Sequence, residues 1–403
     1  MKNIFTAADI LLPEVRNTDM TKWSIIACDQ YTSEPEYWDR ARELVGECPS
    51  TLDLFLPEIY LSESERAVPA INAKMREYTK NILCEHKNTM IYLKRIIPDG
   101  RVREGIVGKV DLEAYDYVKG SNAPVRATEQ TVIERIPPRV AIRRDAEIEL
   151  PHIMMLCDDA DDTLFSRLRN NESGYDLAYD FTLMQGAGAI TGYFISECDA
   201  DFVCKFIDEK GTSGLSLCVG DGNHSLASAK ALYEEIKAEI GDAAAAEHPA
   251  RYALCEIVNI HSPALDFEPI HRVIDNCDVR ELLSFFEQRC TGKGKTHTLK
   301  VIAEGKETSI KIDESEAGIS VDPLQKLLDE YLEGHAGSID YIHGDDSLIK
   351  LSQKEGSVGI FCEPISKQGL FSAVRDGGSL PRKTFSMGVA KEKRHYLEAR
   401  KIK

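Results

Sequence analysis

The sequence predicts an α+β protein in which helices pack against mixed sheets. Apolar segments of strand length and amphipathic segments of helical period occur along the whole chain, but they do not alternate strictly as strand and helix. The charged turn Pro98–Arg101 joins two neighbouring strand patterns directly, which is typical of an antiparallel hairpin. These two observations favour α+β over a doubly wound parallel sheet.

The first segment, residues 1–125, mixes both kinds of element. A strand is expected at Trp23–Ala27, because the run is apolar, short and followed by the turn-forming residues 29–35. Helices are expected at Glu36–Leu44 and Ser62–Cys84, and strands at Met90–Ile97 and Arg103–Val110.

The remaining chain is expected to form a core segment, residues 126–275, and a C-terminal α+β segment, residues 276–403. A loose linker at Gly241–Pro249 lies within the core segment. Strands of the core segment are expected at Ile153–Cys157, Leu215–Val219, Tyr252–Ile260 and Pro269–Ile274. Helices of the last segment are expected at Val279–Arg289 and Asp322–Glu333, and its strands near 298–303, 308–312, 341–342 and 358–364.

Length, charge and cysteine usage exclude several classes of protein. The chain has 403 residues, of which 43% are hydrophobic, so it can bury a full core. Its net charge of −18 argues against sequence-independent binding to nucleic acid or to anionic membranes. No apolar run approaches the length of a membrane span, and Asp9 interrupts the N-terminal apolar stretch that a signal peptide would need. The 11 cysteines are scattered without a C-x-x-C pair, which is typical of reduced thiols in a cytoplasmic protein.

The stretch Leu215–Ile236 carries the strongest functional pattern. A short apolar run turns through Gly220-Asp221-Gly222-Asn223-His224-Ser225 into an amphipathic helix. Free N–H groups and the helix dipole at such a start favour a phosphate, which would lie over residues Gly222, Asn223, His224 and Ser225. Asp221 would hold Mg²⁺ or a hydroxyl, and His224 would donate to a phosphate oxygen. The alternative is a well-capped helix behind a tight turn.

Three further patterns place cations beside polar groups. In Arg126–Thr131, Glu129 would act as a base or metal ligand and Arg126 as an anion clamp; the alternative is a surface strand with a local ion pair. Arg272, next to His271 at the head of an apolar strand, would bind an oxyanion, although a histidine there is more often structural. Lys383 lies in Leu380–Thr384. This segment is expected to be a basic loop over a phosphate; the alternative is a solvated tail.

Two other patterns do not carry the function that they suggest at first. The glycines of Gly186–Gly192 miss the G-x-G-x-x-G spacing of a dinucleotide site. The acidic turn Asp158–Asp162 lacks the glycine and terminal glutamate of an EF-hand loop, so a solvated turn is expected.

Five sequence blocks together carry a family resemblance. They are WSIIACDQYTSEPEYW (Trp23–Trp38), RATEQT (Arg126–Thr131), GDGNHS (Gly220–Ser225), PIHRVI (Pro269–Ile274) and LPRKTFSMG (Leu380–Gly388). In this order they resemble the domain-of-unknown-function family numbered 1015, over nearly the whole chain. The function of that family is not established.

More distantly, Asp221–Ser225 is similar to the motif of the ParB and sulfiredoxin superfamily, which includes free serine kinases. The resemblance implies a ParB/sulfiredoxin-like nucleotide-binding core with additional α+β elements, and a phosphate at the helix start. Asn223 stands where many relatives have His, and Ser225 where they have Thr or Arg. A cation would therefore have to come from Arg126, Arg272 or Lys383. Asn223 also replaces the nucleophilic cysteine of sulfiredoxins, so sulfinic-acid reduction is not expected.

The hypothesis favoured by these patterns is a nucleotide-dependent phosphotransferase, using ATP or ADP with Mg²⁺, that acts on a small hydroxylated metabolite such as serine or phosphoserine. The alternatives are a non-catalytic nucleotide or metabolite sensor and, third, a phosphate-ester hydrolase. The side chains of Glu129, Asp221, His224 and Arg272 are predicted to line one cleft. A homo-oligomer is left open.

Overall fold

The computed structural model describes residues 3–315 and 319–403 and divides the chain into two compact units. Unit 1 comprises Met1–Ala127, Thr131–Leu265 and Val389–Lys403, and unit 2 comprises Thr128–Gln130 and Asp266–Gly388. These boundaries differ from the three consecutive segments expected from the sequence. Strands of the first two segments pair within one sheet, and the last residues of the chain return to unit 1.

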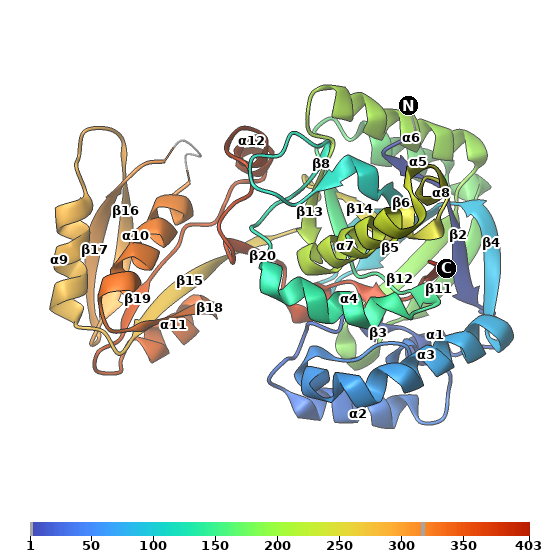
Figure 1. Ribbon diagram of the computed structural model, residues 1–403, viewed down its shortest axis with the longest axis horizontal. Helices are drawn as coiled ribbons and strands as arrows, with labels where there is room; N and C mark the ends of the chain where they lie inside the picture. Colours follow the sequence, from blue (N-terminus) through green and yellow to red (C-terminus); the bar gives the residue numbers. More distant parts are fainter. Residues whose placement is uncertain (1–2, 316–318) are drawn as a thin grey trace. The chain divides into compact units, whose positions relative to one another are not determined.

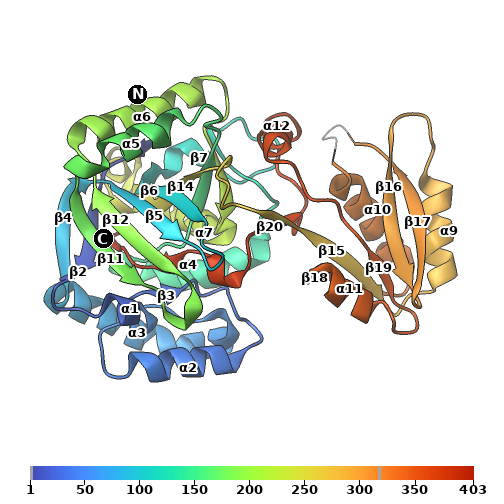
Figure 2. The same cartoon turned by 180° about the vertical axis from the view of Figure 1, so that it is seen from behind.

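Unit 1 is built around a ten-stranded mixed sheet of order β11-β12-β5-β6-β14-β10-β13-β8-β7, with β1 paired to β6 (Figures 1 and 2). In this order, the neighbouring pairs between β11 and β14 are antiparallel, whereas β14/β10, β13/β8 and β8/β7 are parallel. The antiparallel pair β5/β6 confirms the expected hairpin at Pro98–Arg101. The strands are β1 (Phe5–Thr6), β5 (Ile91–Ile96), β6 (Val102–Asp111), β7 (Tyr115–Asp116), β8 (Val125–Ala127), β10 (Met154–Cys157), β11 (Asp176–Thr182), β12 (Ala189–Phe194), β13 (Leu217–Asp221) and β14 (Tyr252–Asn259).

Three two-stranded ribbons and the helices complete unit 1. The final segment of the chain supplies one strand to each of two ribbons, β21/β3 and β22/β9. The ribbon strands are β2 (Ala8–Pro13), β3 (Ile25–Ile26), β4 (Leu83–Thr89), β9 (Ile148–Glu149), β21 (His395–Tyr396) and β22 (Arg400–Lys401). The helices are α1 (Met20–Trp23), α2 (Pro35–Val45), α3 (Ser64–Asn81), α4 (Ile136–Arg144), α5 (Thr163–Asn171), α6 (Glu197–Thr212), α7 (Asn223–Ile240) and α8 (Asp242–Ala245).

Helix α7 shows why the sequence folds this way locally. Leu226, Ala229 and Tyr233 recur at helical spacing and are buried in the same core as Val219 of β13. The strand and the helix therefore share one apolar core, and the polar residues between them are left at the turn. The predicted strand and helix at this point are confirmed, with the helix beginning at Asn223.

Unit 2 is an antiparallel sheet of order β17-β16-β19-β15-β18, with β20 also paired to β15. Helices α9 and α10 contribute Phe286, Leu324 and Leu328 to its main core. Leu348 of α11 packs in a smaller cluster with Val273 of the sheet. The strands are β15 (Phe267–Asp275), β16 (Thr296–Ala303), β17 (Lys306–Asp313), β18 (Ser338–His343), β19 (Val358–Ile360) and β20 (Phe385–Met387). The helices are α9 (Val279–Arg289), α10 (Val321–Gly334), α11 (Asp345–Leu351) and α12 (Lys367–Gly377).

The strand expected at Trp23–Ala27 is only partly correct. Helix α1 ends at Trp23, and only Ile25–Ile26 forms a strand. Asp19 caps α1 through its side chain, which accepts hydrogen bonds from the N–H groups of Thr21 and Lys22. The apolar run is split because Trp23 is fully buried and its indole N–H donates to the Leu397 carbonyl at 2.9 Å. Within the described residues, no helix is both long and apolar enough to cross a membrane.

Candidate functional site

The start of α7 in unit 1 has the geometry of an anion-binding turn. Gly222 lies between β13 and α7 with a φ of 79°, in the left-handed region that favours glycine. A Cβ there would lie 3.0 Å from the Ile153 Cα, so a side chain would force the neighbouring main chain to shift. The first N–H groups of α7 have no partner within the helix, and Gly222 offers no side chain to cap them. The turn thus leaves an N-terminal helix end of the type that binds phosphate.

Charged and polar groups surround this turn. The Asp221 carboxylate accepts a hydrogen bond from the Gly222 N–H at 3.0 Å and pairs with the Lys393 ammonium at 3.2 Å. Lys393 is only 8% exposed, so the protein holds this cation in place beside the helix start. The Asn223 side-chain oxygen is buried and has no hydrogen-bond partner among the described residues. This amide oxygen is an acceptor, so a hydroxyl or amino group of a ligand, and not a phosphate oxygen, would complete its hydrogen bonding.

Further groups extend the site, and we call Asp29, His152, Asp221, Lys393 and Tyr396 the Asp29 cluster. The His152 Nε2 lies 3.7 Å from the Asp29 carboxylate, and its Nδ1 lies 2.9 Å from the Tyr396 hydroxyl. The His152 ring also lies 3.5 Å from where a Cβ of Gly222 would stand, so the cluster adjoins the helix start. A carboxylate, an imidazole, a phenol and an ammonium are thereby gathered beside one anion-binding turn.

The electrostatics of the cluster favour an ionised Asp29. Burial raises the pKa of its carboxyl, but His152, a hydrogen bond from Gln30 and the charge of Lys393 outweigh burial, so the pKa lies below its ordinary value. Sequence reasoning quoted Asp29 within a motif but gave it no role, and it missed His152, Lys393 and Tyr396. His152 follows Pro151 without a recognisable motif, and Lys393 and Tyr396 lie in the tail, so only the fold brings them to the site.

Two of the residues expected in the site are engaged elsewhere in unit 1. The His224 Nε2 accepts a hydrogen bond from the Val132 N–H at 3.3 Å. The Arg126 guanidinium is 6% exposed and donates to the carbonyls of Ala123 at 2.8 Å and Gly214 at 2.6 Å. In this structure Arg126 therefore ties two loops together at the base of β8.

The other expected residues belong to unit 2, where Glu129 holds a loop. Its two carboxylate oxygens accept hydrogen bonds from the main-chain N–H groups of Lys383, Thr384 and Phe385 at 3.0, 2.9 and 3.3 Å. Burial raises the pKa of Glu129 above its ordinary value, although these three donors act in the opposite direction. A raised carboxyl pKa suits a general base, but both oxygens already have hydrogen-bond partners.

Arg272 and Lys383 meet at the same loop. The fully buried Arg272 guanidinium donates to the carbonyl of Lys383 at 2.9 Å and also to that of Ile270. Lys383 has a φ of 58°, and its side chain is exposed. The sequence patterns containing Glu129, Arg272 and Lys383 are thus brought together within unit 2, where a carboxylate and a guanidinium fix the main chain of one loop. The single cleft expected for Glu129, Asp221, His224 and Arg272 stays a prediction.

The residues present could hold Mg²⁺ only if the phosphates of a bound nucleotide supplied most of its ligands. Among the described residues, no group of three or more His, Cys, Asp or Glu side chains could hold a metal. Mg²⁺ at nucleotide sites is commonly bound through one or two carboxylates together with phosphate oxygens. Asp221 offers one such carboxylate, although Lys393 occupies one of its oxygens.

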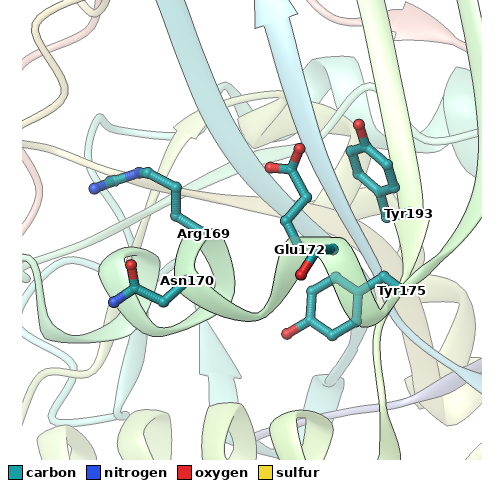
Figure 3. Close-up of a pocket in the computed structure, with 6 residues that line it drawn as sticks. Arg169, Asn170, Glu172, Tyr175 and Tyr193 are labelled. Atoms are coloured by element: carbon teal, nitrogen blue, oxygen red, sulfur yellow. The ribbon is translucent and has the colours of Figure 1, made fainter.

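A shallow pocket of about 480 Å³ lies elsewhere on unit 1, between the end of α5 and strand β12 (Figure 3). Its charged side chains are already paired, since Arg169 contacts Glu104 and Asp162, and Glu172 contacts Lys94. It contains none of the predicted site residues. Its lining residues are Arg169, Asn170, Glu172, Ser173, Tyr175 and Tyr193.

Solved structures provide distant likenesses to this fold. A free serine kinase in complex with AMP is 11% identical, with a TM-score of 0.39 over 70% of this chain and 91% of its own. SbnI with a C-terminal truncation, from Staphylococcus aureus, is 12% identical, with a TM-score of 0.38 over 70% of this chain and 82% of its own. A conserved hypothetical protein from Pyrococcus furiosus is 10% identical, with a TM-score of 0.36 over 70% of this chain and 94% of its own. Likenesses at this level do not assign a function to this chain.

A match to a family model shows to which family the chain belongs. No curated protein matches the chain at a significant level. The model of a family described as a protein of unknown function, DUF1015, matches residues 12–331, which include the turn at Asp221–Ser225 and most of the predicted motifs. The chain therefore belongs to the DUF1015 family of proteins of unknown function.

Proposed function

We propose that unit 1 binds a nucleotide with its phosphates at the start of α7, and that the protein transfers a phosphoryl group to a small hydroxylated metabolite such as serine. One observation carries the proposal. A glycine turn packed closely against Ile153 opens a long helix directly beside a buried lysine and a carboxylate, with Asp221 and Lys393 only 3.2 Å apart. Phosphoryl transfer depends chiefly on positioning and on neutralising charge, which such a set of groups supplies.

Each group has a defined part in the proposed reaction. The N–H groups of residues 223–225 bind the phosphate oxygens, since that of Gly222 donates to Asp221. Lys393 supplies the cation that a serine at position 225 does not provide. The bond between the terminal phosphorus and its bridging oxygen breaks, and a new bond forms between that phosphorus and the acceptor hydroxyl oxygen. The hydroxyl proton passes to a carboxylate, and the nucleotide leaves with one phosphate fewer. When bound, Mg²⁺ would neutralise phosphate charge beside Asp221.

Two carboxylates are candidates for the base. Glu129 was expected from the sequence, and burial raises its pKa. Asp29 is supported by its position in the cluster, where His152 contacts it at 3.7 Å. The base in solution is identified by comparing Glu129→Gln with Asp29→Asn, with the exposed Asp39→Asn as a matched control. Loss of general-base help lowers the transfer rate by about a hundredfold to ten-thousandfold, with little change in nucleotide affinity.

The binding step has its own test. Lys393→Met removes the buried cation, so the dissociation constant for ADP or ATP is expected to rise by about tenfold to a hundredfold. Lys391→Met, two residues away and exposed, is the control and should bind as the wild type does. His224→Ala is expected to weaken both binding and transfer. Calorimetric titration measures affinity, and phosphorus NMR with ATP or ADP and serine measures transfer. Equal affinities for both lysine variants would contradict the proposed phosphate position.

A non-catalytic nucleotide sensor is the second candidate. The observation that favours it is the occupied carboxylate of Glu129, whose oxygens accept three main-chain N–H groups. A sensor needs no base near the phosphate. Nucleotide binding without transfer to any small alcohol, in the wild-type protein, would select this function, whereas release of inorganic phosphate would select hydrolysis.

A further inference from the structure

A second polar site lies in the interior of unit 1, in a cavity that we call the arginine cavity. Its volume is about 10 Å³, which is room for one water-sized particle. Ten residues line it, and the charged ones among them are at most 4% exposed. They are Ser24, Leu93, Arg95, Arg103, Ile190, Glu256, Arg394, His395, Leu397 and Glu398.

The charges around this cavity do not balance. Three guanidinium groups face two carboxylates. Arg394 occupies both carboxylates, since it pairs with Glu256 at 2.9 Å and with Glu398 at 2.8 Å. Arg103 lies 4.0 Å from Glu256 and shares that partner.

The third guanidinium, Arg95, forms no ion pair, although the charges of Glu256 and Glu392 act on it from a greater distance. It donates to the carbonyls of Ala187 at 2.7 Å and Lys391 at 3.0 Å, and no described carboxylate lies within ion-pair distance of it. The remaining titratable lining residue does not compensate this charge. Burial and the nearby arginines hold the pKa of His395 well below its ordinary value, so its ring is neutral. The residues that line the cavity thus carry a net positive charge, which Glu392 offsets only from outside the lining. Such a charge in a low-dielectric interior is costly unless an anion lies close to it.

The hydrogen bonds around the cavity are also incomplete, and mostly on the donor side. The Nε atoms of Arg95 and Arg103 and the Ser24 hydroxyl are buried without a hydrogen-bond partner among the described residues, as is the Nε2 of His395. The Arg95 guanidinium lies 3.4 Å from the Nδ1 of His395. The same Nδ1 lies 3.3 Å from the Lys393 carbonyl, so Nε2 is a donor when Nδ1 accepts from Arg95 and an acceptor when Nδ1 donates to Lys393. An oxygen of Glu256 is an orphaned acceptor.

We propose that the arginine cavity binds a monatomic anion of the chloride type, held by the guanidinium of Arg95 and its neighbouring donors. A water molecule, which is smaller than chloride, would satisfy some of the orphaned donors but would bring no negative charge to Arg95. A halide satisfies both requirements, because it accepts several hydrogen bonds and carries one negative charge. A polyatomic anion such as phosphate does not fit a cavity of about 10 Å³.

The test is the thermal stability of the full chain in sodium chloride and in sodium gluconate at equal ionic strength. Because the halide binds only the folded protein, the melting temperature of unit 1 is expected to rise in chloride, by about 5 °C at chloride concentrations roughly a hundredfold above the dissociation constant. In Arg95→Gln this chloride-specific rise should disappear. Arg101→Gln, on the turn of the same hairpin and paired at the surface with Asp99, should keep it.

Bromide provides a direct measurement that does not depend on the variants folding. In crystals of the wild-type protein containing bromide, an anomalous peak is expected at the arginine cavity. The Ser24→Ala protein, which loses one donor and keeps all the charge, should bind bromide more weakly but still show the peak. Equal melting temperatures in chloride and gluconate, together with no bromine peak, would overturn the proposal and assign a water molecule to the cavity.

Discussion

At the scale of single residues, Gly222 occupies a backbone position that a side chain would disturb in two ways. Its φ of 79° is unfavourable for any other residue, and a Cβ would meet the Ile153 Cα at 3.0 Å. Gly241, at the other end of α7, has a φ of 81° with nothing within 4 Å of its Cβ position. Alanine at Gly222 would therefore suffer both backbone strain and a steric contact, whereas alanine at Gly241 would suffer backbone strain alone.

Gly222→Ala is expected to lower the free energy of unfolding of unit 1 by about 1–3 kcal/mol and to abolish nucleotide binding, because the turn must shift away from β10. Gly241→Ala carries only backbone strain, about 1–3 kcal/mol, because a φ of 81° with a ψ of 160° is almost confined to glycine, and it should bind nucleotide normally. Urea unfolding and calorimetric titration measure the two effects. Wild-type nucleotide affinity in Gly222→Ala would show that the phosphate lies elsewhere.

His395 predicts how stability depends on pH. Burial and the charges of Arg95, Arg103 and Arg394 hold its folded-state pKa well below 6.5, so the unfolded state binds a proton more readily. The free energy of unfolding should therefore decrease as pH falls below about 6.5, by at most ~1.4 kcal/mol per pH unit from this group. Denaturant unfolding from pH 7.5 to 5 measures the slope.

Variants of two histidines of unit 1 test whether His395 causes this dependence of stability on pH. His395→Asn should flatten the slope, because the group that takes up the proton on unfolding is gone. His86→Gln on β4, where burial also lowers the pKa of the ring but to a smaller extent, should retain most of it. If both variants keep the wild-type slope, another group controls the acid sensitivity.

At the scale of elements, the loop between Leu380 and Phe385 is fixed by side chains rather than by a sheet. The carboxylate of Glu129 accepts its N–H groups, and the guanidinium of Arg272 donates to its carbonyls. The exposed side chains of Arg382 and Lys383 are thereby displayed from a rigid main chain. Their position depends on two buried groups that lie far apart in the sequence.

Glu129→Gln is expected to loosen this loop. Its amide NH₂ can accept no hydrogen bond, so at least one main-chain donor loses its partner, which costs about 1–3 kcal/mol. Hydrogen exchange at the amides of residues 383–385 should accelerate by about tenfold to a hundredfold, and exchange in unit 1 should not change. Glu268→Gln, exposed on β15, is the control. Unchanged protection at 383–385 would show that Glu129 does not hold the loop.

Sequence periodicity predicted the elements whose polar and apolar faces are distinct. Helix α9 has the predicted bounds, and α10 and the hairpin β5–β6 agree to within a residue or two. The sequence could not show that the run Trp23–Ala27 divides into helix and strand, because Trp23 is held by the distant carbonyl of Leu397. Nor could it show that Lys393 pairs with Asp221, since no local pattern connects residues that a whole folded unit separates.

At the scale of the whole molecule, the two units have separate hydrophobic cores. Phe165 is buried in unit 1 and Phe286 in unit 2, each 1% exposed. These units differ from the consecutive segments predicted from the sequence, because apolar patterning shows that a residue is buried but not in which core. The motif at Asp221–Ser225 was recognisable because its chemistry is local, whereas the Asp29 cluster is assembled from four distant parts of unit 1.

Truncating one phenylalanine at a time should therefore destabilise one unit at a time. Phe165→Ala and Phe286→Ala each leave a cavity in a packed core, which costs about 3–5 kcal/mol. Differential scanning calorimetry should show two transitions, with each variant lowering only one of them. A single transition that both variants lower equally would show that the units unfold together.

The path of the chain through the units has a consequence for biosynthesis. The strands β3 and β9 pair only with β21 and β22, which the ribosome completes after all of unit 2. A nascent chain that has just released α7 holds the glycine turn but not Lys393, so its phosphate site lacks the cation. Unit 2 is therefore synthesised while unit 1 is still open, and the order of translation delays assembly of the proposed nucleotide site until residues 389–403 emerge.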